Sequence, residues 1–174
     1  MRNADFIPDC YKKPILVLGC GNVLFGDDGF GPAVIEYLEQ NYKIPEDVCL
    51  MDAGTGVREV LFTIILSEKK PKKIIIVDSV DVGRSPGEIV EISIDDIPKN
   101  KIDDFSIHQL PTSNLLKDLQ NLCKVEVIII AAQVESIPKM VKPGLSESLV
   151  NSIPKTCEMI IKFTEANFSK NFAF

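Results

Sequence analysis

Short apolar runs recur along the chain and predict buried strands. They are rich in isoleucine and valine, and two are apolar almost throughout, which is typical of strands covered on both faces of a parallel sheet. The runs are PILVLGC, DVCLMDA, KKIIIVDS and KVEVIIIAAQ, at residues 14–20, 47–53, 72–79 and 124–133. The segment PGEIVEISI at 86–94 follows the third run after a turn too short for a parallel crossover, so it is predicted to be an antiparallel edge strand.

Between these runs, apolar residues return every three or four positions and predict amphipathic helices. Two such patterns cover residues 30–38 and 57–65, and a third helix is expected to begin at Thr112 or Ser113, either of which can cap it. The pattern at 146–166 contains Pro154, which predicts one kinked helix or two short ones. Residues 167–174 are expected to be either frayed or docked.

The alternation of strands and helices predicts an α/β fold. We expect a single three-layer domain with a mostly parallel, twisted sheet of about five strands, one antiparallel edge strand, and helices on both faces. The domain is predicted to span residues 1–174, with a core from about 14 to 165.

Composition narrows the classes of partner. The formal charge of −6 argues against nucleic acid or an acidic membrane surface. No apolar run approaches the roughly 20 residues of a membrane helix and no signal-peptide core is visible, so a cytoplasmic protein is predicted. The five cysteines are scattered without a C-x-x-C pair, which predicts reduced thiols; they are Cys10, Cys20, Cys49, Cys123 and Cys157.

Polar side chains cluster where the predicted strands end, and ligands bind beyond the carboxyl ends of such strands. Asp27 and Asp28 follow the first strand, Asp52 ends the second, and Asp78 ends the third, while Gln133 and Glu135 follow the last. The only histidine, His108, lies in the loop that returns to the third helix. At least two carboxylates and one imidazole are therefore expected to converge on one cleft.

Three kinds of site fit the stretch GCGNVLFGDDGFG at 19–31 to different degrees. A dinucleotide site would need glycine where Leu24 stands, and the paired acids would repel a pyrophosphate. A phosphorelay receiver would place its acidic pair directly after the strand. A metal site fits best, because carboxylates and a neutral imidazole suit borderline divalent ions such as nickel or zinc and leave coordination positions open.

Each of these residues also has a purely structural interpretation. Asp27 and Asp28 could cap the following helix, Asp78 could hold a turn, and His108 could be a surface residue. Whether Asp27 caps the helix, helps to bind a ligand or does neither is left open. Gly19 and Gly21 are expected to turn the chain sharply off the first strand.

Four stretches together resemble the hydrogenase maturation endopeptidases. They are ILVLGCGNVLFGDDGFGPAVIEYL, DAGT at 52–55, IIIVDSVD followed by PGEIV, and HQLPTSNLL, and they occur in the order and spacing of that family. The resemblance implies that Asp28, Asp78 and His108 bind a metal. It also implies that the loop with Asp52, Gly54 and Thr55 handles the substrate.

The family resemblance implies a peptidase that removes the C-terminal extension of a [NiFe]-hydrogenase large-subunit precursor. Nickel would be recognised in the substrate, so in isolation the site could be empty or hold another divalent ion. The stretches AAQVESIPKMVKPGLSESL and DAGT resemble the proteases of coenzyme F420-reducing hydrogenases. The implied partner is the precursor. Charge and the lack of a membrane-length apolar run predict no nucleic-acid and no membrane partner, and a monomer is expected because the partner is a folding client.

The sequence offers no nucleophile–base pair with a recognisable spacing. An aspartyl-type mechanism remains, in which Asp52, or one of the ligands Asp28 and Asp78, activates a water molecule. A nickel-binding module without proteolysis and a dinucleotide-binding protein stay as alternatives.

Overall fold

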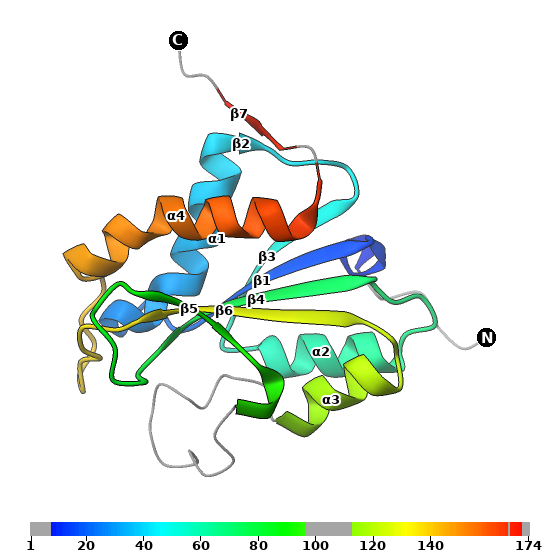
Figure 1. The fold of residues 1–174 in the computed structure, drawn as a ribbon, viewed down its shortest axis with the longest axis horizontal. Coiled ribbons are helices and arrows are strands. Elements are labelled where there is room, and N and C mark those ends of the chain that lie inside the picture. Colours follow the sequence, from blue (N-terminus) through cyan, green and yellow to red (C-terminus); the bar gives the residue numbers. More distant parts are fainter. Residues whose placement is uncertain (1–7, 97–112, 167, 172–174) are drawn as a thin grey trace.

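The structure is a computed structural model that describes residues 8–96, 113–166 and 168–171. Its centre is a sheet in the order β3-β1-β4-β6-β5, in which β5 alone runs antiparallel to its neighbour. The strands are β1 (Ile15–Cys20), β3 (Val48–Gly54), β4 (Lys73–Val80), β5 (Ile89–Ile92) and β6 (Glu126–Gln133). The predicted α/β sheet with one antiparallel edge strand is therefore confirmed (Figure 1).

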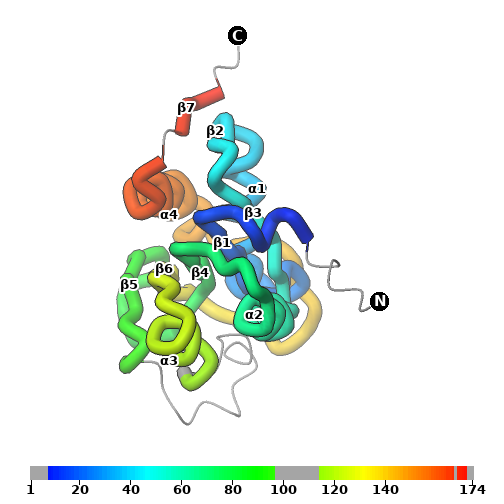
Figure 2. Tube along the Cα trace, turned by 90° about the vertical axis from the view of Figure 1, so that its right-hand side faces the viewer, coloured from blue at the N-terminus to red at the C-terminus, as the bar shows by residue number. Residues whose placement is uncertain are grey.

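Two pairs of helices cover the two faces of this sheet (Figures 1 and 2). One face carries α1 (Phe30–Asn41) and α4 (Glu147–Thr164), and the other carries α2 (Val57–Leu66) and α3 (Ser113–Asn121). Three short 3-10 helices complete the set: η1 (Asp9–Lys12), η2 (Gly26–Gly29) and η3 (Ile94–Asp96). None of the helices in the described ranges is long and apolar enough to cross a membrane.

Side chains alternate between the two faces along each strand, which makes two buried clusters from one sheet. Val17 of β1 and Ile75 of β4 pack towards α1 and α4, whereas the preceding residues Leu16 and Ile74 pack towards α2 and α3. This burial on both faces explains why the runs are apolar almost throughout.

The structure decides between the alternatives that the sequence left open for the helix with Pro154 and for the tail that follows it. The segment with Pro154 forms one helix, α4, and Pro154 lies on its exposed side. Beyond it, β7 (Ser169–Lys170) pairs antiparallel with β2 (Tyr42–Lys43), so this part of the tail is docked. The ring of Phe168 contacts that of Tyr42 edge-on, with centroids 6.4 Å apart.

The prediction that all five cysteines are reduced is wrong for Cys10 and Cys49, which form a disulfide. The helix η1 lies against the start of β3 and brings the two Cα atoms to 5.5 Å, although the residues are 39 positions apart. Sequence spacing carries no information about such a tertiary contact. Cys20, Cys123 and Cys157 are free thiols.

Candidate active site

The chain leaves β1 at Gly21, in a conformation that favours glycine. Its φ is +131°, and a side chain there would collide with the carbonyl of Asp28 and reach to 3.8 Å from Asp78 Oδ1. Its N–H donates to the carbonyl of Gly54 at 3.0 Å. The expected turn therefore occurs at Gly21 and brings three strand ends together, whereas Gly19 lies within β1 and packs closely against α1.

Asp28 lies in η2, between β1 and α1, and its side chain is buried, with 3% of the residue exposed. Its Oδ2 accepts a hydrogen bond from the backbone N–H of Asn22 at 3.0 Å. Burial raises the pKa of Asp28 to about 6, although the Asn22 N–H acts in the opposite direction. Asp28 is therefore a carboxyl group that can gain or lose a proton near neutral pH.

Asp78 lies near the end of β4 and is completely buried. Its Oδ1 accepts a hydrogen bond from the N–H of Ser79 at 2.7 Å. Burial raises the pKa of Asp78 well above its ordinary value; the Ser79 N–H lowers it, and the negative charge of Asp28 raises it further. The two carboxyl groups therefore act on each other electrostatically.

Each of these aspartates has one oxygen without a partner. Asp28 Oδ1, Asp78 Oδ2 and the neighbouring Ser79 Oγ are buried and accept no hydrogen bond from the residues that the structure describes. Buried polar atoms are almost always satisfied, so an unpaired oxygen on each of two aspartates whose charges interact indicates a position for a cation or a proton. This observation fits the expected metal site.

His108, the third expected ligand, lies outside the described residues. Among the residues that are described, no group of three or more histidine, cysteine, aspartate or glutamate side chains is arranged to hold a metal ion. The metal-binding set of Asp28, Asp78 and His108 therefore stays a prediction, and the structure describes only Asp28 and Asp78 of the three.

Asp52 lies near the end of β3, opposite Gly19 of β1, and its side chain is exposed. Its Oδ1 accepts the N–H of Gly54 at 2.9 Å, which fixes the DAGT turn at a left-handed Gly54 with φ of +51°. Thr55 follows in this turn and is exposed. The three residues expected to handle substrate thus form one surface turn at the carboxyl edge of the sheet.

Cys20, at the end of β1, lies between the strands that carry Asp52 and Asp78. Burial raises the pKa of its thiol well above the ordinary value, and the negative charges of Asp78 and Asp52 raise it further. A thiol in such surroundings stays protonated and is a poor nucleophile. Cys20 is therefore not the nucleophile of the reaction, which agrees with the absence of a recognisable nucleophile–base pair in the sequence.

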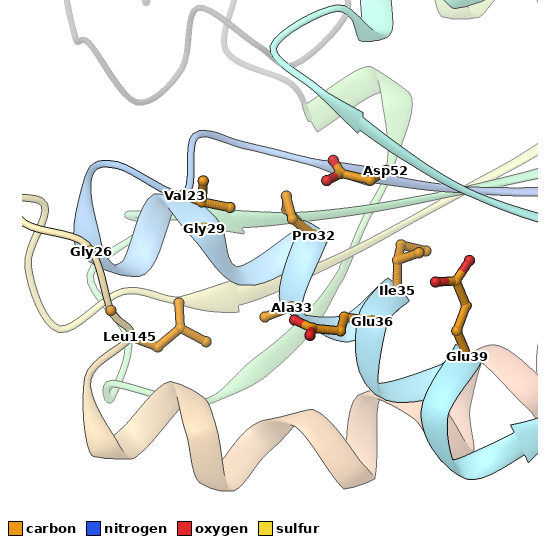
Figure 3. A pocket seen from close by; sticks show the side chains of 11 residues that line it. Val23, Gly26, Gly29, Pro32, Ala33, Ile35, Glu36, Glu39, Asp52 and Leu145 are labelled. Carbon is orange, nitrogen blue, oxygen red and sulfur yellow. The ribbon is translucent and has the colours of Figure 1, made fainter.

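A groove of 340 Å³ runs beside α1 and reaches Asp52 (Figure 3). Val23 and Leu145 lie towards one end of it, and Asp52 and Glu39 lie towards the other, with Glu36 between them. The lining does not include Asp28 or Asp78, because both carboxyl groups are buried. The groove therefore opens the carboxyl edge of the sheet to solvent at Asp52.

Asp27 has a role that the sequence did not reveal. It does not cap α1; its buried carboxylate accepts hydrogen bonds from Glu135 N at 2.8 Å, Ser146 N at 2.6 Å and Ser146 Oγ at 3.0 Å. A further, longer bond comes from Ser136 N at 3.4 Å. Asp27 therefore joins the loop after β1 to both ends of the segment between β6 and α4.

Gln133, at the end of β6, is a second positioning residue. Its buried side chain accepts the N–H groups of Val82 and Arg84 and donates to Asp81. It fixes the turn after β4. Its position at a strand end was visible in the sequence, but its partners lie about 50 positions away.

Solved structures with the same fold define the class of protein. The hydrogenase maturating endopeptidase HybD of E. coli has a TM-score of 0.71 and 26% identity, over 90% of this chain and 95% of that one. A [NiFe] hydrogenase maturation protease of Thermococcus kodakarensis shares the fold with a TM-score of 0.70 and 21% identity. The chain therefore has the α/β fold of these endopeptidases.

Sequence relatives identify the family. A model of the hydrogenase maturation proteases matches residues 32–163. A relative from Methanocaldococcus jannaschii, provisionally named a hydrogenase maturation protease, is 40% identical over 86% of this chain and 96% of its own. The coenzyme F420 hydrogenase subunit delta of Methanothermobacter thermautotrophicus is 37% identical over 87% of this chain and 94% of its own. The chain belongs to the hydrogenase maturation protease family and is a peptidase.

Proposed function

We propose that this peptidase removes the C-terminal extension of a nickel-loaded [NiFe]-hydrogenase large-subunit precursor, and that its client is a coenzyme F420-reducing hydrogenase. The observation that carries the nickel-dependent part is the pair of unpaired, buried carboxylate oxygens, Asp28 Oδ1 and Asp78 Oδ2. The 37% identity to an F420 hydrogenase subunit supports the choice of client.

The residues divide into a recognition set and a set for the cut. Asp28 Oδ1, Asp78 Oδ2 and the imidazole of His108 would face the nickel ion of the client, which belongs to the substrate and aligns the segment to be cut. Carboxylate and imidazole ligands suit this ion. Without it, each carboxyl group binds a proton more readily than an exposed aspartate does, because burial raises the pKa of both.

Asp52 is the proposed general base. Gly54 N–H holds one of its oxygens at 2.9 Å, so the carboxylate is oriented while the other oxygen stays available to a water molecule. That oxygen takes a proton from the water as the water oxygen attacks the scissile carbonyl carbon. The proton then passes to the leaving amine, which completes hydrolysis of the peptide bond. The groove that Asp52 lines supports the idea that the cut segment lies there.

Mass spectrometry of precursor incubated with the purified enzyme tests this proposal. With nickel-loaded precursor, we expect the mass of the C-terminal extension to be lost; with nickel-free precursor, we expect no change. Asp52→Asn should lower kcat by about a hundredfold or more with little change in KM, since it removes a general base. Asp47 is also an exposed aspartate, and it lies just before β3, at the end of the strand away from Asp52. Asp47→Asn is therefore the matched control and should leave processing unchanged.

The recognition set is tested by Asp28→Asn, Asp78→Asn and His108→Ala. Each variant should lose the ability to distinguish nickel-loaded from nickel-free precursor, with processing reduced about a hundredfold or more. Wild-type rates in all three would refute the site. A wild-type enzyme that binds nickel-loaded precursor without changing its mass would instead be a nickel-binding module.

A further inference from the structure

Two loops beside the candidate active site expose an unusual share of the apolar surface. Of the nine large apolar side chains that are exposed in the described part of the chain, four lie on these loops. They are Val23 and Leu24, which are 53% and 46% exposed, and Met140 and Val141, which are 79% and 63% exposed. Clustered apolar exposure of this kind marks an interaction surface, whereas isolated exposed residues need no explanation.

The two loops are paired with each other. Lys142 N donates to Leu24 O at 2.9 Å, Gly26 N donates to Lys142 O at 2.9 Å, and Phe25 and Lys142 form a parallel bridge. The loops therefore lie side by side, and both gather where β1 and β6 end (Figure 1). We name the surface made by residues 23–26 and 138–144 the paired-loop face.

The paired-loop face is held in one arrangement before any partner arrives. Asp27 bonds to both ends of the segment that carries Met140 and Val141, as described above. Pro138 and Pro143 bracket the exposed stretch and restrict its backbone. A surface fixed in this way loses little conformational entropy when a partner binds, which favours recognition.

Charge on the paired-loop face differs from that of the whole chain. Lys139 and Lys142 flank the exposed Met140 and Val141, and neither ammonium group has a hydrogen bond or an ion pair with another described residue. The chain as a whole carries a charge of −6. The complementary partner surface is therefore apolar with acidic groups around it.

Position identifies the partner. The loop that contributes Val23 and Leu24 continues directly into Asp28, and Val23 also lines the groove that reaches Asp52. A protein that delivers a chain segment to these aspartates must lie against this loop. We propose that the paired-loop face docks the folded body of the hydrogenase precursor, through an apolar patch with an acidic rim next to the segment that is cut. The inference rests on the proposed function.

The test compares binding and processing of the nickel-loaded precursor by the wild type and by the double variant Met140→Asp/Val141→Asp. Both side chains are exposed, so the fold should be kept. We expect KM and the dissociation constant to rise about tenfold or more, because two apolar contacts are replaced by acids facing an acidic rim, while kcat changes less than twofold. The single variant Met140→Leu keeps an apolar side chain at this position and should bind the precursor with wild-type affinity. Leu66→Asp, at the opposite end of the sheet and 70% exposed, is the control.

The charge component has its own measurement. Lys139→Glu/Lys142→Glu should slow association with the precursor about tenfold at low salt and flatten its dependence on salt. Lys155→Glu, an exposed lysine on α4, should change neither quantity. An effect of Lys155→Glu about half as large, in proportion to its charge change, would show that only net charge matters and would refute the acidic rim.

The outcomes separate this inference from the proposed function. Wild-type cleavage together with an unchanged KM in Met140→Asp/Val141→Asp refutes the docking face and leaves the function standing. Precursor binding that depends on Met140 and Val141 without any cleavage supports the face and refutes the function. Failure of the wild type to bind precursor refutes both. Binding to phosphatidylcholine–phosphatidylserine vesicles, or self-association, that the double variant abolishes would assign the face to a membrane or to a second copy instead.

Discussion

Asp28 and Asp78 combine burial with an incomplete set of hydrogen bonds. Each uses one oxygen to accept a neighbouring backbone N–H and leaves the other without a partner among the described residues. In the absence of a ligand, apolar side chains of similar size at these two positions would stabilise the fold better than two buried carboxyl groups do. Local rules of good packing and pairing are most often broken at functional sites, so this disadvantage points to a ligand that completes the pair.

The raised pKa of Asp28 predicts how the stability of the metal-free protein depends on pH. Its pKa in the folded state is about 6, against an ordinary value of 3.8, so the folded protein binds the proton more tightly than the unfolded chain. Stability linked to this group is present below pH 4 and is lost as pH rises from about 4 to 6. Asp28→Asn has no such proton, so its free energy of unfolding relative to the wild type should increase over that range.

Urea unfolding of the two proteins at several pH values, with a chelator present, measures this difference. Asp47→Asn should follow the wild type at every pH, since Asp47 is exposed. A difference between Asp28→Asn and the wild type that is constant with pH would contradict the raised pKa.

Sequence reasoning placed Asp28, Asp52 and Asp78 correctly at the carboxyl edge, because Asp52 and Asp78 end apolar runs and Asp28 lies in the loop that follows one. Asp27 was ambiguous for a physical reason. Its partners Glu135 and Ser146 lie more than 100 positions away, so no local pattern announces its hydrogen bonds. A ligand and a structural anchor stand next to each other in the sequence, and only tertiary contacts tell them apart.

At the scale of elements, the strands and the first two helices were predictable because both are set by local periodicity. Buried strands read as continuous apolar runs, and the short turn before 89–92 required an antiparallel partner. The identity of that partner, β6, was not available from the sequence, since pairing between distant strands is a tertiary property. The same limit applies to η1, whose cysteine finds its partner in β3.

The disulfide between Cys10 and Cys49 predicts a measurable contribution to stability. It closes a loop of 39 positions, and the chain entropy removed from the unfolded state corresponds to about 4 kcal/mol. Cys10→Ser should therefore lower the free energy of unfolding by about 2–4 kcal/mol under oxidising conditions. Denaturant unfolding with and without reductant gives the value, and reductant should destabilise the wild type but leave Cys10→Ser unchanged.

Cys123→Ser is the matched control, because Cys123 is a free thiol outside this link. Its stability should stay within about 0.5 kcal/mol of the wild type, and it should keep its response to reductant. Titration of thiols in the unreduced, unfolded protein should find two fewer than the five in the sequence. Five reactive thiols would refute the link.

At the scale of the whole molecule, the carboxyl edge of the sheet collects the features that concern a client. The buried aspartates, the turn of Asp52, the groove and the paired-loop face all belong to the ends of neighbouring strands. This arrangement follows from parallel topology, because every parallel strand delivers its following loop to the same edge. A folded client that covers this edge would contact all of these features at once.

The same surface predicts that the free enzyme is a monomer. A symmetric dimer through the paired-loop face would place Lys139 and Lys142 of one copy near those of the other. Two chains of charge −6 also repel each other. Light scattering from about 1 to 100 µM should give the mass of one chain throughout. Addition of nickel-loaded precursor should give a complex of one enzyme and one precursor, whereas a mass that doubles with concentration in both the wild type and Met140→Asp/Val141→Asp would place a dimer interface elsewhere on the molecule.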